Sequence, residues 1–181
     1  ALAARHLARK DASRLLVVGT GRLSINLIEA HSRVRSLDDV MIWGRDKDKA
    51  SLAATEANAL GYPVRVVDDL EAAARQADII SCATLSRSPL IQGAWLQPGS
   101  HLDLIGSFTP AMREADDACF QGAALHVDTD EALAKSGDLL GPLERGVITP
   151  ASVCGTLAGL CRGQAPGRSA PIPACTVSGR C

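Results

Sequence analysis

Residues 15–24, LLVVGTGRLS, most constrain the fold: a short apolar run meets two glycines separated by one residue. The run is typical of a buried strand, and a helical pattern opens at Arg22. Gly19 would make a tight turn, and Gly21 would leave room for a phosphate near the backbone. The pattern predicts a dinucleotide-binding strand, turn and helix, with the pyrophosphate at the helix N-terminus. Two glycines after a strand also occur in ordinary turns, so the rest of the chain must decide.

Further apolar runs follow, and helical patterns separate the first four of the predicted strands. The predicted strands cover residues 15–18, 40–43, 64–67, 79–83, 101–105 and 124–127, and the helices between them cover 22–34, 47–60 and 70–76. Strands alternating with helices favour a parallel sheet whose two faces are both covered. The predicted fold class is therefore α/β, a Rossmann-like, doubly wound and mainly parallel sheet with flanking helices.

The two ends of the chain fall outside this alternation. Helical patterns cover residues 2–10 and 150–162, and the composition after residue 163 shifts to Gly, Pro, Ser and Arg. Such a segment lacks the periodicity of a helix or strand. We therefore expect a dinucleotide-binding domain with flanking helices over residues 1–168 and an irregular or disordered tail over 169–181.

The composition argues against several classes of partner. The 19 basic and 20 acidic residues give a formal net charge of -1, and only 3% of the residues are aromatic, so we expect no nucleic-acid partner. No apolar run approaches the roughly 20 residues that span a bilayer, so no membrane partner is expected either. The Arg-rich start lacks the apolar core of a secretion signal; it fits a surface helix better than a transit peptide.

Cysteine and histidine usage indicates a reducing, cytoplasmic setting without a metal site. The six cysteines form no CxxC pair, and the four histidines are scattered. The first four cysteines lie in apolar stretches and are expected to be buried, whereas Cys175 and Cys181 are expected to be exposed thiols. His101 lies in a predicted strand and is interpreted as structural, so no catalytic residue is predicted.

Arg45 follows the second predicted strand and bears on which cofactor is bound. An Arg near this point accommodates the 2′-phosphate of NADP, whereas an acidic residue binds the ribose hydroxyls of NAD. Lys49 could add positive charge, but Asp46 keeps NAD open as an alternative. All three residues could also merely cap and solvate the next helix. We favour NADP(H) over NAD(H).

Small and polar residues end the fourth and fifth predicted strands. Thr84 and Ser86 could bond a ribose or phosphate, or could simply provide turn polarity, and Gly106 would let a nicotinamide ring approach the backbone. Pro110 is expected to begin a helix, with the charged residues 113–117 on its solvated face.

Several stretches together resemble the ornithine cyclodeaminase/μ-crystallin family, in the order in which that family carries them. They are ALAARHLARKDASRLLVVGTG, VMIWGRDKDKA, ADIISCATLSRSPLI, WLQPGSHLDLIGSFTPAMREADD, HVDTDEALAKSGDLL and VITPASVCGTLAGLCRGQAPGR. The resemblance implies an NAD(P)-binding Rossmann-like domain, with Leu85 near the nicotinamide. The predicted cofactor contacts are Gly19, Thr20, Gly21, Arg22, Leu23, Arg45, Lys49, Ala83, Thr84, Leu85, Ser86 and Gly106.

Phe108 separates the branches of this family. The resemblance implies that cyclodeaminases of this family carry a catalytic Asp at the position where this chain has Phe108. Ammonia-releasing cyclisation needs the acid/base group that this Asp supplies. The resemblance therefore implies an NAD(P)H-dependent reductase of cyclic ketimines, which forms proline or pipecolate from Δ1-pyrroline-2-carboxylate or Δ1-piperideine-2-carboxylate. An ornithine cyclodeaminase, an alanine dehydrogenase-like enzyme and a non-catalytic, μ-crystallin-like NADPH-binding protein remain the alternatives.

The resemblance also implies that the chain carries only the cofactor half of such an enzyme. The family's substrate- and dimer-forming segment is expected before residue 1, and residues 169–181 do not match the family's final segment. We accordingly expect a cyclic imino acid substrate and a possible homodimer only for the full-length form, and little or no activity from this chain alone.

Overall fold

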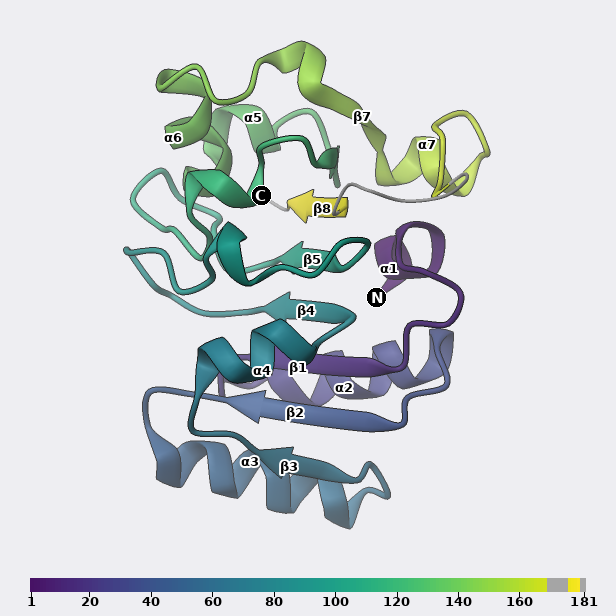
Figure 1. The fold of residues 1–181 in the computed structure, drawn as a ribbon, viewed down its shortest axis with the longest axis vertical. Helices are drawn as coiled ribbons and strands as arrows, with labels where there is room; N and C mark the ends of the chain where they lie inside the picture. Colours follow the sequence, from purple (N-terminus) through teal and green to yellow (C-terminus); the bar gives the residue numbers. More distant parts are fainter. Residues whose placement is uncertain (169–175, 180–181) are drawn as a thin grey trace.

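A computed structural model describes residues 1–168 and 176–179 of the chain, and over these residues the strands form one parallel sheet (Figure 1). The strands are β1 (Arg14–Val18), β2 (Asp39–Trp43), β3 (Val64–Val66), β4 (Ile79–Cys82), β5 (His101–Leu104), β6 (Ala124–Val127), β7 (Val153–Thr156) and β8 (Thr176–Gly179). Their order across the sheet is β3-β2-β1-β4-β5-β8-β6-β7. The predicted Rossmann-like, doubly wound fold class is confirmed.

Helices cover both faces of this sheet. They are α1 (Leu2–Leu7), α2 (Leu23–Val34), α3 (Lys47–Ala59), α4 (Leu70–Gln76), α5 (Ala132–Lys135), α6 (Gly137–Glu144) and α7 (Leu157–Cys161), with short 3-10 helices η1 (Gly93–Trp95), η2 (Asp117–Cys119) and η3 (Pro150–Ser152). Aspartate caps begin two of them: Asp46 accepts from the Lys49 N–H of α3, and Asp69 from the Ala72 N–H of α4. These caps explain why both helices begin where the sequence predicts.

The alternation of side chains along β1 divides the core into two layers. Leu16 and Val18 pack in the layer that contains α4, whereas Leu15 and Val17 pack with Ile28 of α2 in the other layer. All five side chains are fully buried. A parallel strand covered on both faces is largely apolar, which is why β1 can be predicted from the sequence.

The order of the strands fixes where a ligand can bind. β1 lies between β2 and β4, so the chain leaves β1 toward one side of the sheet and later returns to pair on the other. The connections after β1 and β4 therefore diverge at the carboxyl ends of these two strands. In open α/β sheets this switch point is the usual site for ligands.

The tail predicted to be irregular over 169–181 contains a strand, so that prediction is wrong for residues 176–179. β8 lies between β5 and β6 and pairs with both, with Val177 opposite Leu102 and Leu125. A segment of four residues with one large apolar side chain does not by itself predict a strand. Pairing with β5 and β6 gives these residues their strand conformation. Residues 169–175 and 180–181, including Cys175 and Cys181, lie outside the described residues.

Two helix predictions also need correction. The helix predicted over 150–162 is interrupted, because Val153–Thr156 form β7 beside β6 and only Leu157–Cys161 are α-helical. Thr156 explains the change, since its hydroxyl oxygen accepts from the Gly159 N–H and caps α7. The helix predicted after Pro110 is absent from the described part of the chain, where residue 115 instead bridges to Ile91.

The cysteines divide into a buried and an exposed pair. Cys82 and Cys119 are buried free thiols, as predicted, but Cys154 and Cys161 are exposed. Both exposed residues lie in short elements at the edge of the sheet, where an apolar neighbourhood in sequence does not produce burial. Over the described residues, no helix has the length and apolar character needed to cross a bilayer.

Candidate dinucleotide-binding site

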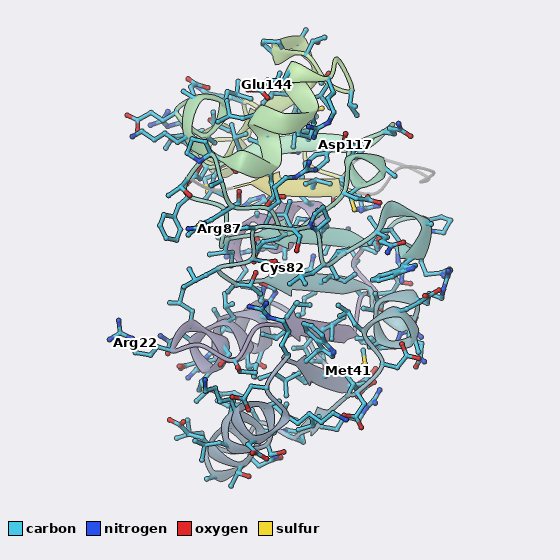
Figure 2. The ribbon with its side chains drawn as sticks, turned by 90° about the vertical axis from the view of Figure 1, so that its left-hand side faces the viewer. Arg22, Met41, Cys82, Arg87, Asp117 and Glu144 are labelled. Atoms are coloured by element: carbon cyan, nitrogen blue, oxygen red, sulfur yellow. The ribbon has the colours of Figure 1, made fainter. Side chains whose placement is uncertain are left out.

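A cleft of about 350 Å³ lies over the carboxyl ends of β1, β2 and β4. These ends point left in Figure 1, and Figure 2 looks onto that edge. The volume lies within the range of small-molecule sites. The cleft is lined by Gly19, Thr20, Gly21, Trp43, Gly44, Arg45, Asp46, Lys49, Ala83, Thr84, Leu85, Ser86 and Leu90. Nine of the twelve predicted contacts are in this lining; Arg22, Leu23 and Gly106 are not.

The turn after β1 requires one glycine and leaves open space at the other. Gly19 has a φ of +118°, and an added Cβ would lie 2.6 Å from the backbone oxygen of Ala83. Its N–H donates to the Trp43 oxygen at 2.9 Å, which ties the turn to β2. Gly21 has no atom within 4 Å of an added Cβ, so the space that a phosphate would need is present.

The first turn of α2, which follows these glycines, is not neutralised by the protein. Arg22 at its N-cap makes no capping side-chain bond, and the first turn contains no acidic residue. The N–H groups and the positive end of the helix dipole at this point therefore favour an anion. In Figure 2 the Arg22 side chain projects outward from the α2 side of the molecule.

After the end of β2, the Asp46 carboxylate is bonded by Lys49 of α3, whereas Arg45 makes no such ion pair within the described residues. One Asp46 carboxylate oxygen accepts from the Lys49 N–H at 3.1 Å, and the other lies 3.3 Å from Lys49 Nζ. The backbone bond from Lys49, followed by its side chain, lowers the pKa of Asp46. Arg45 is exposed and makes no ion pair within residues 1–168 and 176–179. The free cation at this corner is thus Arg45.

The hydroxyl groups of Thr84 and Ser86, which follow β4, donate to other groups of the protein. Thr84 Oγ1 donates to Glu114 Oε1 at 2.8 Å, and Ser86 Oγ donates to the Ser88 oxygen at 2.7 Å. Their hydrogens are therefore used within the protein, although both residues line the cleft. Leu85 between them is 69% exposed and presents an apolar side chain to the cleft.

Gly106 lies beneath this turn. A Cβ there would overlap the Thr84 backbone oxygen and come within 2.5 Å of Glu114 Oε1. The absence of a side chain at Gly106 is therefore explained by the Thr84 backbone and Glu114.

Glu114 is the residue that the sequence interpretation missed. The stretch 113–117 was expected to be a solvated helix face, but Glu114 is fully buried and its carboxylate bonds the ends of β4 and β5. The cleft is also lined by four residues that are not among the predicted contacts: Trp43, Gly44, Asp46 and Leu90. A charged pentapeptide without apolar spacing contains no signal that distinguishes a buried carboxylate from a solvated one.

Comparisons with known proteins agree with this architecture. The ornithine cyclodeaminase/mu-crystallin family model matches residues 1–173. A Delta(1)-pyrroline-2-carboxylate reductase of Paracoccus denitrificans is 43% identical over 163 residues, which are 89% of this chain and 52% of that protein. The chain therefore spans about half the length of the curated relatives it matches.

Two solved structures superpose closely on the chain. Thermococcus litoralis Delta(1)-pyrroline-2-carboxylate reductase, in complex with NADH and L-proline, gives a TM-score of 0.92 at 28% identity, over 98% of this chain and 56% of that one. An archaeal alanine dehydrogenase dimer with bound NAD gives 0.91 at 26% identity, over 99% and 55%. From the family match and the identity to the reductase, the chain belongs to the ornithine cyclodeaminase/mu-crystallin family.

Proposed function

We propose that this chain is the dinucleotide-binding part of an NAD(P)H-dependent reductase of cyclic ketimines. The observation that carries the proposal is the open Gly21 position at the start of α2, beside the switch point between β1 and β4. A phosphate there would meet the positive end of α2, whose first turn contains no acidic residue. The relatives named as Delta(1)-pyrroline-2-carboxylate reductases support the reaction class.

Each part of the lining has a role in this proposal. The turn Gly19–Gly21 would hold the pyrophosphate, Arg45 and Lys49 would face the adenosine end, and the Ala83–Ser86 turn would border the nicotinamide end. Bound NAD(P)H would supply the hydride that reduces the imine carbon of the substrate. Leu85 and its exposed apolar surface would exclude water from that end of the cleft.

NADP(H) is the proposed cofactor form, because Asp46 is occupied by Lys49 and Arg45 is not paired. Arg45→Ala should weaken NADPH binding about tenfold, the loss expected for a charge-assisted bond to a phosphate, and should change NADH binding by less than about twofold. Fluorescence titration with each cofactor measures both values. Lys47→Ala is the matched control, because Lys47 is an exposed cation two residues away that pairs with Asp68 outside the cleft. Equal losses for NADPH and NADH would remove Arg45 from the 2′-phosphate role.

Among the possible reactions, reduction of a cyclic ketimine is favoured by Phe108. This side chain is 50% exposed after β5, at the position where the resemblance to cyclodeaminases implies a catalytic Asp. Alanine dehydrogenase activity is the second candidate, because the dehydrogenase with bound NAD superposes almost as well as the reductase. A full-length form assayed with Δ1-pyrroline-2-carboxylate, and separately with pyruvate and ammonia, discriminates the two reactions.

The isolated chain should bind cofactor and turn over little substrate. We propose that the full-length form supplies the imino acid contacts and assembles as a homodimer, as the archaeal dehydrogenase does. The proposed setting is reducing and cytoplasmic, which is consistent with the free thiols of Cys82, Cys119, Cys154 and Cys161. The tests are a steady-state assay and a cofactor titration of the 181-residue chain. Oxidation of NADPH or NADH at an appreciable rate with the ketimine would contradict the expected low turnover, and the absence of binding of both cofactors would contradict the proposed function.

A further inference from the structure

Glu114 lies at the centre of an arrangement that joins two strand ends beneath the cleft. Its Oε1 accepts from the Thr84 N–H at 2.6 Å and from the Thr84 hydroxyl at 2.8 Å. Its Oε2 accepts from the Gly106 N–H at 2.7 Å. One carboxylate, fully buried, thus connects the second residues beyond β4 and β5.

Three donors converge on this carboxylate, and that number determines which protonation state fits. An ionised carboxylate offers only acceptors, so it accommodates all three donors. A protonated carboxyl group can donate its hydrogen to the Thr84 hydroxyl, which then reverses its role, but its bonds from the Thr84 and Gly106 N–H groups lose the assistance of the negative charge. The ionised form therefore holds Thr84 and Gly106 in this geometry more strongly than the neutral form does.

The clamped groups reach the cleft directly. Thr84 lines the cleft and, through its Oγ1, accepts from the Ser86 N–H at 3.2 Å. Glu114, Thr84 and Ser86 thus form a connected series from beneath the sheet edge to the cleft wall. Since the added Cβ at Gly106 would meet the Thr84 backbone, the β4 and β5 ends are already in close contact, and the carboxylate fixes that contact.

We propose that Glu114 is a positioning residue for the cofactor cleft: its carboxylate clamps Thr84 and Gly106 in the binding geometry, and protonation of Glu114 loosens this clamp and weakens dinucleotide binding. This inference rests on the proposed dinucleotide site. It adds a dependence of that site on the ionisation of one buried group that does not itself line the cleft.

Within the described residues, no basic side chain pairs with the carboxylate of Glu114. Asp138 of α6 accepts from the Glu114 N–H at 2.9 Å and adds a second buried carboxyl. Arg113 directs its guanidinium to Asp117 and to the Ala115 oxygen. The Cys82 thiol of β4 is fully buried, which raises its pKa well above the ordinary value, so it stays neutral.

Burial and the neighbouring Asp138 bring the protonation of the Glu114 carboxylate close to neutral pH. Burial raises the pKa of Glu114 to about 7, against the lowering effect of the bonds from Thr84 and Gly106, and Asp138 raises it further. The folded state therefore disfavours the ionised form of Glu114, so stabilisation of the fold does not explain why a carboxylate is buried here. A costly buried charge that organises a cleft is typical of a functional position.

The test follows the Thr84 and Gly106 amide signals of the 181-residue chain by NMR between pH 5 and pH 9, without cofactor. Both amides should shift together with a midpoint near pH 7 as the carboxylate that they bond gains its proton. In Glu114→Gln this shared titration should vanish. Glu56→Gln, an exposed position on α3, is the matched control and should leave it unchanged. Amides that do not titrate together, or that titrate alike in Glu114→Gln, would overturn the inference.

Titration of the same samples with NADH measures how the dissociation constant of the cofactor depends on pH. The dissociation constant should rise about tenfold from pH 8 to pH 6, because the ionised fraction falls from about nine-tenths to about one-tenth. Glu114→Gln should bind about tenfold more weakly at pH 8 and lose this pH dependence. If Glu114→Gln fails to fold, the amide titration and the NADH titration of the unmodified chain still test the inference.

The two proposals fail in different ways. Titrating amides in a chain that binds no NADH would support the clamp and contradict the proposed function. NADH binding with the same affinity at pH 6 and pH 8 would contradict the clamp and support the proposed function.

Discussion

Gly21→Asp should abolish measurable NADH binding while leaving the protein folded. The position is exposed and has no atom within 4 Å of an added Cβ, so the side chain fits without disturbing the core. The new carboxylate stands at the unneutralised start of α2, where a negative charge stabilises the helix by about 0.3–1 kcal/mol. The same field would attract a pyrophosphate, so the carboxylate takes its place and repels it. We expect affinity to fall at least about 100-fold, because like charges in one site cost several kcal/mol.

Gly21→Asn separates charge from size in this experiment. Asn has nearly the same shape as Asp but no charge, so it should lose less affinity than Asp while still occupying the space of the phosphate. Thermal unfolding of both variants should resemble that of the unmodified chain. If Asp and Asn weaken NADH binding equally, charge repulsion is not the cause, and if neither weakens it, the turn is not the phosphate site.

Gly106→Ala should destabilise the fold by about 3 kcal/mol or more, because overpacking at a site that cannot yield costs at the upper end of the usual range. The added methyl group would meet the backbone of Thr84, which cannot yield, and the carboxylate of Glu114, which is buried and held by three hydrogen bonds. Urea unfolding followed by circular dichroism measures the change in the free energy of unfolding.

Gly21→Ala provides the matched control for this substitution. It introduces the same methyl group at the same edge of the sheet, into open space and without a positive φ. Its free energy of unfolding should stay within about 0.5 kcal/mol of the unmodified chain. Two variants of equal stability would show that the β5 end can move away from Thr84, contrary to the close contact described here.

The strands that are buried on both faces could be predicted from the sequence, and the reason is physical. Leu15–Val18 and Ile79–Cys82 are covered on both faces by the two core layers, so every position except the buried Ser81 is apolar. The glycine turn and the ends of β2 and β4 were predictable as well, because the carboxyl ends of neighbouring parallel strands meet at one edge. Nine predicted residues accordingly line a single cleft.

What could not be predicted depends on long-range pairing and on burial of charge. β8 has Val177 as its one large apolar residue and is stabilised by strands that lie 75 and 52 positions earlier in the chain, with His101 and Ala124 both opposite Thr176. Glu114 lies among charged residues and is buried because Thr84 and Gly106 supply its bonding partners. Neither fact is a property of the local sequence.

The central claim is that the turn after β1 and the turn after β4 hold a nicotinamide dinucleotide between them. Titrating the 181-residue chain with NADPH, and separately with NADH, while recording the backbone amide signals tests this most directly. We expect saturable shifts concentrated at Gly19, Thr20, Gly21, Ala83 and Thr84, on both sides of the switch point. Saturable binding that leaves these amides unchanged and shifts residues elsewhere, or no binding of either cofactor at millimolar concentration, would contradict it.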